Sequence, residues 1–413
     1  MRYALLIPLA FVLAGCGTLA RQPAAPPPIT AALNVSFENE EIRYSPLEDL
    51  KKLQGNISRA FAEETPDCYV IGDDGKRVYN YLAISGGGSD GAFGAGLLNG
   101  WTKAGTRPHF KIVTGVSTGG LIAPFAFLGP EYDEQLKLSY TTIDASHVFE
   151  LRGLLPLLWS EALTSTAPLR QLIDTYIDDK VLKAVAIEHA KGRRLFIAST
   201  DLDNEQPIIW DMGAIASSKS KNKLELFRKV LLASAAIPSL FPPVIFDVTK
   251  DGKTYQELHV DGGVVFQSFF VGSSTDLQAT IRAAHPDWGE AFAQNLYVIR
   301  NGWVNPVFQP VERGLTSITS RAILSMFKMS GVNDLWRLYF SSRDDNVAFR
   351  YTAIPADYVP GTTEQFDNAE MNREFKLGEE IAEDGIQWVT SPPGYAGQSQ
   401  PAVAPADAPN ETP

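Results

Sequence analysis

The chain has 413 residues, of which 45% are hydrophobic and 20% are charged, a composition typical of a globular protein with one large core or two ordinary ones. Its 36 basic and 48 acidic residues give a net charge of −12, and Lys and Arg form no cluster interleaved with aromatic residues. Such a chain would repel a polyanion, so we expect no nucleic-acid partner. The sequence shows no internal repeat.

The amino-terminal residues have the features of an export signal. One Arg precedes an apolar run at residues 4–12, which is too short to cross the ~30 Å hydrocarbon core of a bilayer as a helix. The run leads into LAGC at residues 13–16, which resembles the lipobox of bacterial lipoproteins. This resemblance implies removal of residues 1–15, acylation of Cys16 and, because Gly17 rather than Asp follows, an outer-membrane location in the cell envelope. The alternative is an ordinary signal peptide with an incidental cysteine.

Two further segments lack the pattern of a folded domain. Residues 16–35, rich in Pro and Ala, are predicted to form the lipidated end and a semi-rigid tether. Residues 391–413 have a similar composition and are predicted to be a disordered tail. The folded domain is therefore expected at residues 36–390. Besides Cys16 the chain has only Cys68, so we expect no internal disulfide and a fold that is stable through its core.

Between these ends, short apolar runs alternate with helical patterns. The runs predict buried strands at residues 78–84, 110–114, 195–199, 207–210 and 295–299. Helices are predicted at residues 92–101, 118–127, 169–177 and 224–233, with a helical insertion near residues 130–190. This alternation favours an α/β fold with a mostly parallel sheet covered on both faces. Ligands of such sheets bind beyond the carboxyl ends of the strands.

The segment KIVTGVSTGG, residues 111–120, contains a candidate nucleophile. A predicted strand leads into Gly115, Ser117 and Gly119, and an apolar helix follows. Glycines two residues on either side of a serine allow close packing of strand and helix, and they leave the hydroxyl at the helix amino terminus. Ser117 therefore has the setting of a nucleophile elbow. The alternative is a turn in which Ser117 only caps the helix.

Three successive glycines, Gly86, Gly87 and Gly88, follow the first predicted strand. Successive N–H groups in such a loop can bind a phosphate or the oxyanion of a tetrahedral intermediate. The segment also has the spacing of a dinucleotide loop, which requires an acidic residue about 20 positions further on to hold the ribose. No Asp or Glu occurs between Gly91 and Pro130, so an oxyanion hole is favoured and no nucleotide cofactor is expected.

Asp261 ends a predicted strand, residues 257–260. An Asp-Gly pair is a common turn signal, but an aspartate at the end of a later strand of the same sheet could reach the edge at which Ser117 lies. Of the five histidines, only His285 follows Asp261 in the order that a Ser, Asp, His triad requires, and its surroundings indicate an exposed turn. A histidine triad stays open, but a dyad of Ser117 and Asp261 is favoured.

These motifs, together with ASAAIPSLFPP at residues 233–243, resemble those of the patatin-like phospholipases over about residues 79–351. The resemblance implies a three-layer α/β/α sandwich and a dyad that hydrolyses acyl esters of lipids without a metal. It implies that Ser117 is the nucleophile, Asp261 the general base and general acid, and Gly86 to Gly88 the oxyanion hole.

Asp90 departs from the family pattern, which usually has Arg or Lys two residues after the triple glycine. The missing cation could face a lipid phosphate, so neutral lipids and simple esters stay open beside phospholipids.

A Leu-rich run, Phe149–Trp159, is either a lid or an apolar helix packed into the core. Two other functions stay open: an esterase or thioesterase acting on small acyl substrates, and a catalytically inactive lipid-binding lipoprotein of the envelope.

Overall fold

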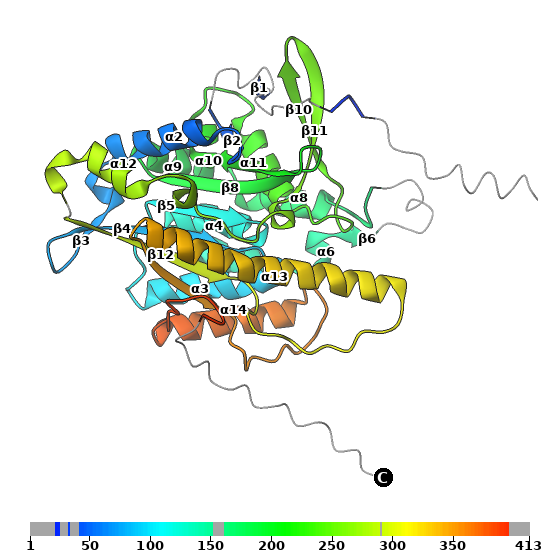
Figure 1. The fold of residues 1–413 in the computed structure, drawn as a ribbon. Helices are drawn as coiled ribbons and strands as arrows, with labels where there is room; N and C mark the ends of the chain where they lie inside the picture. The colour runs from blue at the N-terminus through cyan, green and yellow to red at the C-terminus, as the bar shows by residue number, and fades with distance from the viewer. Residues whose placement is uncertain (1–20, 25–31, 34–40, 152–160, 290, 396–413) are drawn as a thin grey trace, which may run out of the picture.

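The computed structural model describes residues 21–24, 32–33, 41–151, 161–289 and 291–395 (Figure 1). The main sheet has eleven strands, and its centre consists of five parallel strands in the order β8, β5, β4, β12 and β13. These strands are β4 (Arg77–Ile84), β5 (Ile112–Val116), β8 (Arg194–Asp201), β12 (Phe292–Arg300) and β13 (Ala348–Ala353).

Antiparallel strands are added to this parallel centre. Most of them extend the sheet on the β8 side, where β9 and β11 pair with β8, β2 pairs with β9, β10 pairs with β11, and β1 pairs with β10. The short strand β3 pairs with β4, and β6 and β7 form a separate small sheet. The bounds are β1 (Ala32–Leu33), β2 (Arg43–Tyr44), β3 (Val70–Ile71), β6 (Glu150–Leu151), β7 (Thr164–Ser165), β9 (Gln206–Asp211), β10 (Val244–Lys250) and β11 (Lys253–Asp261).

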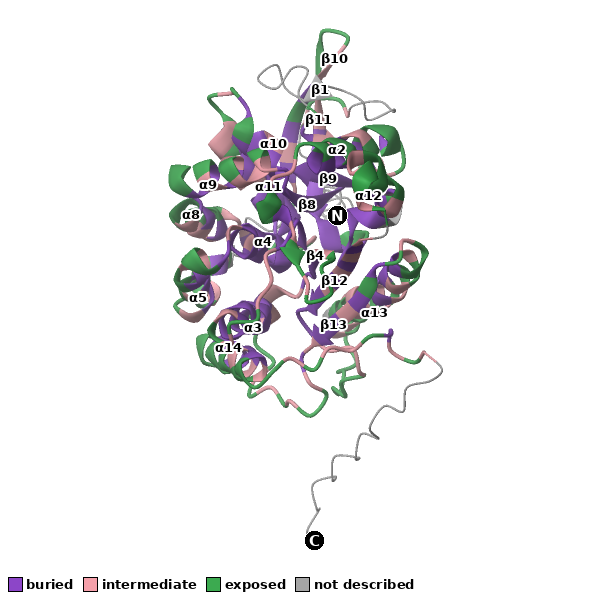
Figure 2. Cartoon of the chain, turned by 90° about the vertical axis from the view of Figure 1, so that its left-hand side faces the viewer, coloured by how far each residue is buried: buried purple, intermediate pink, exposed green. Residues whose placement is uncertain are grey.

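Helices cover both faces of the sheet (Figure 2). On one face lie α3 (Gly91–Lys103), α4 (Thr118–Leu128), α5 (Asp133–Thr141), α8 (Ala167–Tyr176), α9 (Asp179–Ala190), α11 (Lys223–Ser234) and α14 (Asn368–Glu383). On the other lie α2 (Leu50–Ala62), α12 (Leu277–Ala284) and α13 (Leu315–Asp344). The short α-helices are α6 (Ala145–Val148) and α10 (Met212–Ser217), and the 3-10 helices are η2 (Pro66–Cys68), η3 (Gly88–Asp90), η4 (Pro130–Tyr132), η5 (Gly262–Val264), η6 (Val271–Ser274) and η7 (Pro286–Trp288).

The two faces of the sheet each face their own hydrophobic core. Along β4, Leu82 and Ile84 belong to the core under α3 and α4, whereas Tyr81 and Ala83 belong to the core under α2 and α13. Successive side chains of a strand point to opposite faces, so a strand that is apolar throughout needs helices on both sides. The prediction of a three-layer α/β fold with a mostly parallel central sheet is confirmed. None of the helices in the described residues combines the length and apolar character that crossing a bilayer requires.

Candidate active site

Ser117 lies in the turn between β5 and α4 with a φ of 54°, in the left-handed region that residues other than glycine rarely adopt. The flanking glycines make this turn possible. A Cβ on Gly115 would lie 2.4 Å from the carbonyl oxygen of Gly119, and a Cβ on Gly119 would lie 2.3 Å from that of Ile84. The Ser117 N–H donates to Ser234 Oγ of α11 at 3.0 Å. The turn thus has the strained strand–turn–helix geometry of a nucleophile elbow.

Strands β5 and β11 meet end to end along one edge of β8. β5 pairs with β8 as far as Val116, opposite Ala198, and β11 continues along β8 with Asp261 opposite Ser199. Because β9 occupies the other edge of β8 over these residues, β5 and β11 must share one edge. Consecutive residues of β8 therefore bring the two strand ends together, and Ser117 Oγ donates to Asp261 Oδ2 at 2.6 Å.

The Asp261 side chain is enclosed by protein, with 3% of the residue exposed. Burial raises the pKa of its carboxyl to about 7, and hydrogen bonds from the Ser117 hydroxyl and the Gly263 N–H oppose that rise. The Gly263 N–H donates to Oδ1 at 2.7 Å, so the other oxygen faces Ser117. An aspartate near its ordinary pKa of about 3.9 is a weak base for a hydroxyl. Burial therefore gives Asp261 the basicity that proton abstraction near neutral pH requires.

Among the described residues, which include all five histidines, no histidine hydrogen bonds to Ser117 or Asp261. The ring of His285, the candidate for a triad, stacks on Trp288 with centroids 3.7 Å apart. His259 is fully buried and uses Nδ1 in a 2.8 Å hydrogen bond with the hydroxyl of Ser199. The geometry thus places Asp261, and no imidazole, beside the serine hydroxyl.

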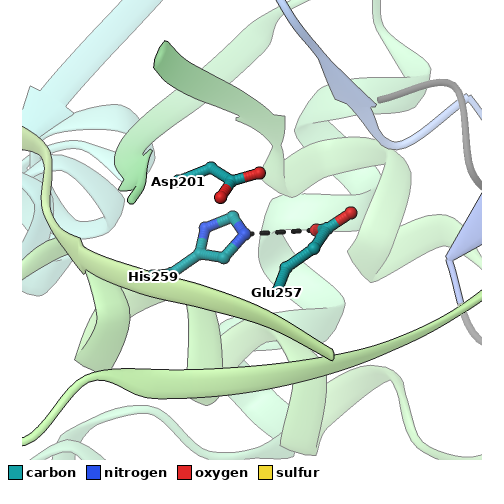
Figure 3. A group of neighbouring side chains, drawn as sticks. All are labelled: Asp201, Glu257 and His259. Carbon is teal, nitrogen blue, oxygen red and sulfur yellow. Dashed lines mark hydrogen bonds and ion pairs between the residues drawn. The ribbon is translucent and has the colours of Figure 1, made fainter. Parts of the chain in front are cut away.

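Asp201, Glu257 and His259 form a buried group whose possible ligand atoms lie within 4.8 Å of one another (Figure 3). Within the described part of the chain it is the one group of three potential metal ligands. Burial alone would raise the pKa of the Glu257 carboxyl. The positive charge of Arg43, which pairs with this carboxylate, and a hydrogen bond with His259 outweigh burial and lower the pKa to about 2. His259 Nε2 lies 3.3 Å from the same carboxylate. These partners make the group an internal ion-pair network between β2, β8 and β11.

The glycine loop crosses the carboxyl end of β4 next to Ser117. A Cβ on Gly86 would lie 3.2 Å from Ser117 Cβ, and a Cβ on Gly87 would lie 2.1 Å from a backbone carbonyl oxygen. The Gly86 N–H donates to the Gln267 carbonyl at 2.9 Å. The N–H groups of Gly87 and Gly88 have no acceptor in the described chain. Of the three predicted glycines, these two have N–H groups that remain available to an oxyanion.

The end of β12 supports this loop with two polar side chains. Arg300 Nη1 donates to the Gly86 carbonyl at 2.8 Å and to Ser85 Oγ at 3.0 Å. Asn301 Nδ2 donates to the Ser85 carbonyl at 2.8 Å. Burial raises the pKa of Asp90 to about 7, and the positive charge of Arg300 opposes that rise. A cation therefore does lie beside the loop, but it comes from β12 rather than from position 90.

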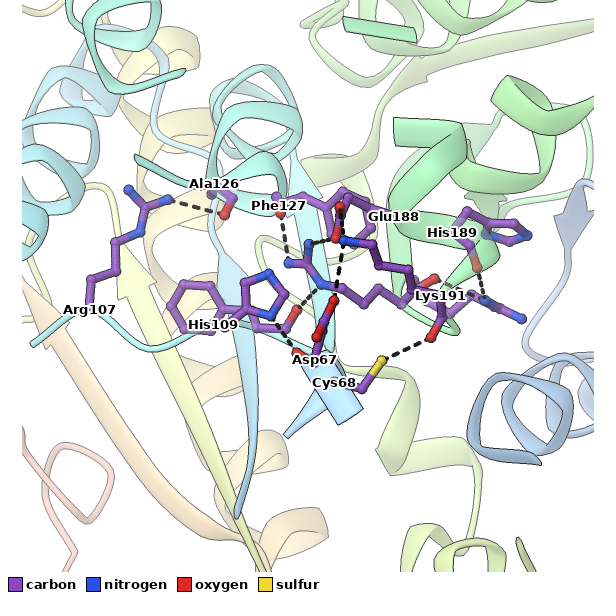
Figure 4. Close-up of polar contacts among 12 residues, drawn as sticks. Asp67, Cys68, Arg107, His109, Ala126, Phe127, Glu188, His189 and Lys191 are labelled. Atoms are coloured by element: carbon purple, nitrogen blue, oxygen red, sulfur yellow. Dashed lines mark hydrogen bonds and ion pairs between the residues drawn. The ribbon is translucent and has the colours of Figure 1, made fainter. Parts of the chain in front are cut away.

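The opposite end of α4 is held by two buried arginines (Figure 4). Arg107 donates to the Ala126 carbonyl at 3.1 Å and Arg193 donates to the Phe127 carbonyl at 2.7 Å. Cations at a helix carboxyl terminus satisfy its unpaired carbonyls and interact favourably with its dipole. Cys68 lies in the same cluster as a buried free thiol, and burial raises its pKa. The cluster fixes α4, and with it Ser117 at its amino end.

Ser117 and Gly88 line an apolar cavity of about 700 Å³, part of which is open to solvent. It lies between α4, α5, α8 and α11, and its walls include Leu121, Phe125, Ile143, Leu169, Ile173 and Phe241. Mostly apolar walls with a few polar groups are typical of ligand sites. Ser117 thus lines a space whose walls are suited to a hydrocarbon chain.

Most of the predicted lid, Phe149–Trp159, lies outside the described residues, which omit 152–160. Phe149 packs edge-on against Phe366, with ring centroids 6.1 Å apart. Phe366 is itself part of the cavity wall. The start of the segment therefore contacts a residue of the cavity wall, and the lid stays a prediction.

Comparison with known proteins identifies residues 82–270 as matching the family model described as patatin-like phospholipase. No curated protein matches the chain. Similar solved structures include VipD from Legionella pneumophila, which is 11% identical over 76% of this chain and 69% of its own, with a TM-score of 0.33. Human GIVD cytosolic phospholipase A2 is 9% identical over 84% of this chain and 64% of its own, under two thirds of its length, with a TM-score of 0.28.

Proposed function

Residues 82–270 match the family model of the patatin-like phospholipases, and from this premise we propose that the chain is a membrane-anchored serine hydrolase of lipid acyl esters with a Ser117–Asp261 dyad. The observation that carries the proposal is the 2.6 Å hydrogen bond to Asp261 Oδ2 from the Oγ of Ser117, which lines the apolar cavity. The proposed substrates are phospholipids or lysophospholipids, whose acyl chain would occupy the cavity while the ester carbonyl lies against Ser117.

In the proposed acylation step, Asp261 takes the proton of the Ser117 hydroxyl as Oγ attacks the ester carbonyl carbon. The carbonyl oxygen becomes an oxyanion, which accepts hydrogen bonds from the N–H groups of Gly87 and Gly88. The C–O bond to the alcohol then breaks, and the protonated Asp261 gives its proton to the leaving oxygen. This leaves an acyl ester on Ser117 and a free alcohol or lysolipid.

In the deacylation step, water takes the place of the alcohol. Asp261 accepts a proton from the water as its oxygen attacks the acyl carbon, and the same N–H groups stabilise the second oxyanion. Collapse of that intermediate breaks the bond to Ser117 Oγ, and Asp261 returns the proton to the serine. The products are a fatty acid and the original enzyme, and no step requires a metal or cofactor.

The proposed anchor is a lipidated Cys16, which lies outside the described residues. Its support is the lipobox-like sequence at residues 13–16. Two or more acyl chains on one residue give stable membrane attachment, because each buried methylene contributes about 0.8 kcal/mol. We propose a location in the cell envelope, at the outer membrane, on the basis of Gly17.

The proposal is tested with the chain from residue 17 onward, which contains every described residue. This protein is expected to release fatty acid from phospholipid and from p-nitrophenyl esters, and a fluorophosphonate probe is expected to label Ser117. Ser117→Ala should lose hydrolysis and labelling, whereas Ser341→Ala, a change on the outer helix α13, should keep hydrolysis and labelling. A folded wild-type protein that is neither labelled nor active would support the inactive lipoprotein instead, and activity confined to short esters would support an esterase.

Narrowing the cavity is expected to change the preferred acyl length. Leu121 lies about one helical turn beyond Ser117 on α4, and it lines the cavity. Leu121→Trp should lower kcat/KM for p-nitrophenyl dodecanoate by roughly 10–100-fold, because each methylene that can no longer be buried forfeits about 0.8 kcal/mol. Hydrolysis of the butyrate ester should change less than about threefold.

Ile187→Trp provides the matched control, because Ile187 is 51% exposed on α9 and does not line the cavity. This variant should keep the chain-length profile of the wild type. An equal loss of Leu121→Trp activity on the long and the short ester would show that the cavity does not hold the acyl chain.

A further inference from the structure

The amino-terminal half of α13 projects beyond the catalytic edge of the sheet (Figure 1). α13 connects the carboxyl end of β12 to the start of the parallel strand β13, so its amino end belongs to the edge at which Ser117 lies. Gly331 packs against the end of β12, since a Cβ there would lie 2.9 Å from Arg300 Cζ. From Gly331 back to Leu315 the helix extends roughly 24 Å at 1.5 Å per residue.

One side of this projecting half is apolar. Leu315, Ile318, Met326 and Met329 recur at helical spacing on one face and are 85%, 56%, 64% and 53% exposed. We call these four residues the apolar stripe. Phe308, in the segment that precedes α13, is 91% exposed. No described part of the chain covers these side chains, and an exposed apolar area of this kind marks an interaction surface.

The charge around the stripe differs in sign from that of the whole chain. Residues 302–333 contain three basic residues, Arg313, Arg321 and Lys328, and one acidic residue, Glu312, whereas the chain carries a net charge of −12. An apolar stripe in a segment with a net positive charge favours a surface that is both apolar and anionic. Bilayers with anionic lipids have this combination, and each basic residue near such a surface contributes about 1 kcal/mol.

The described chain also begins at the catalytic edge. Arg21 Nη2 pairs with Asp203 at 2.7 Å, and Asp203 follows the carboxyl end of β8. The Gln256 N–H donates to the Pro23 carbonyl at 3.0 Å, which fixes the same segment against β11. The five residues from Cys16 to Arg21 can span at most about 18 Å when fully extended. A lipidated Cys16 would therefore keep the bilayer near the edge from which α13 projects.

We propose that the apolar stripe of α13 docks on an anionic bilayer surface and turns the catalytic edge of the sheet toward the lipid. The proposal rests on the proposed function, because the substrate is taken from that bilayer. It adds a second contact with the membrane that is independent of acylation at Cys16. The helix would lie in the interface with the stripe inserted, since no described helix can cross the bilayer.

The test uses the chain from residue 17 onward and vesicles of phosphatidylcholine with or without phosphatidylglycerol. The stripe variant is Ile318→Glu with Met326→Glu, and the control is Leu324→Glu, which lies on the opposite face of the same helix and is 55% exposed. The stripe variant is expected to lose at least tenfold in co-sedimentation with the anionic vesicles and in fatty acid release from them. Hydrolysis of soluble p-nitrophenyl butyrate should stay within twofold of wild type in both variants.

Equal vesicle binding by the stripe variant and the wild type would overturn the proposal. So would a wild-type dimer that the stripe variant converts to a monomer without loss of vesicle binding, because the stripe would then join two copies of the chain. A wild type that binds vesicles but hydrolyses no ester would instead refute the proposed function alone.

A second measurement avoids the added charges. An environment-sensitive dye on Met326→Cys should shift its emission to the blue when anionic vesicles are added, and the same dye on Leu324→Cys should shift much less. Equal shifts at the two positions would also contradict docking through the stripe.

Discussion

Asp261→Asn is expected to lower kcat for ester hydrolysis by about 10²–10⁴-fold, the range that general acid–base catalysis contributes. The asparagine oxygen can still accept the Gly263 N–H that now donates to Oδ1, so the site should keep its shape. The amide cannot take the proton of Ser117, so the loss should appear in kcat and much less in KM. Steady-state kinetics with a soluble ester at pH 8 measure both values.

The pH dependence follows from the same carboxyl. Because only the ionised form of Asp261 is a base and its pKa is about 7, kcat/KM of the wild type should rise with pH through about 7 and then level off. Asp261→Asn should abolish this rise. If Asp261→Asn keeps full activity while His285→Ala is inactive, the base is His285 and the dyad is wrong.

As the pH rises, the free energy of unfolding should change in the opposite direction from kcat/KM. The folded-state pKa of Asp261 lies above the unfolded value of about 3.9, so its contribution to stability is fully present below about pH 4 and is lost as the pH rises through about 7. Asp261→Asn avoids the buried charge. It should therefore have a higher free energy of unfolding than the wild type at pH 8, and the difference should shrink at pH 5. Urea unfolding at the two pH values checks this and shows that the inactive variant is folded.

Arg300→Met is expected to lower kcat by roughly 10–100-fold with little change in KM, somewhat less than the 10²–10³-fold that loss of an oxyanion donor costs. The Gly86 carbonyl, which accepts from Arg300, and the Gly87 N–H belong to the same planar peptide unit. Arg300 therefore fixes the direction of that N–H, and a charged donor on the carbonyl polarises the unit. Arg300 is a positioning residue for the oxyanion hole and does not itself touch the substrate.

Three companion variants separate this role from a structural one. Gly331→Ala places a Cβ 2.9 Å from Arg300 Cζ and should lower kcat by displacing the guanidinium. Arg300→Lys should restore part of the activity, and Arg350→Met, on β13 away from the loop, should have wild-type kinetics. All of them should keep the rise of kcat/KM near pH 7, because Asp261 is untouched. A lowered melting temperature with unchanged kcat in Arg300→Met would refute the positioning role.

The centre of the fold could be predicted from the sequence because its elements have strong local signals. The six predicted strands correspond to β4, β5, β8, β9, β11 and β12, and the four predicted helices correspond to α3, α4, α8 and α11. β9 pairs antiparallel, which apolar content alone cannot indicate. α13 was missed because its exposed apolar residues and its buried ones lie on different sides of one long helix, so no single apolar face marks it.

The candidate site could be predicted where its residues lie within local motifs. Gly115, Ser117 and Gly119 have the spacing of a nucleophile elbow, and the structure shows the close backbone packing that this spacing predicts. The supporting residues could not be predicted. Ser234 and Arg300 are 117 and 214 residues from their partners in the site, Ser117 and Gly86, and contacts over such separations depend on the sheet order.

The shared edge of β8 means that the separation of Ser117 and Asp261 is determined by a backbone hydrogen-bond ladder. Substitutions in the helices around the cavity can alter which acyl chain fits without moving either group. A shift of β11 by one residue, in contrast, would turn the aspartate to the opposite face of the sheet. The Ser117–Asp261 pair and the shape of the apolar cavity can therefore vary independently, since the sheet positions the first and the surrounding helices form the second.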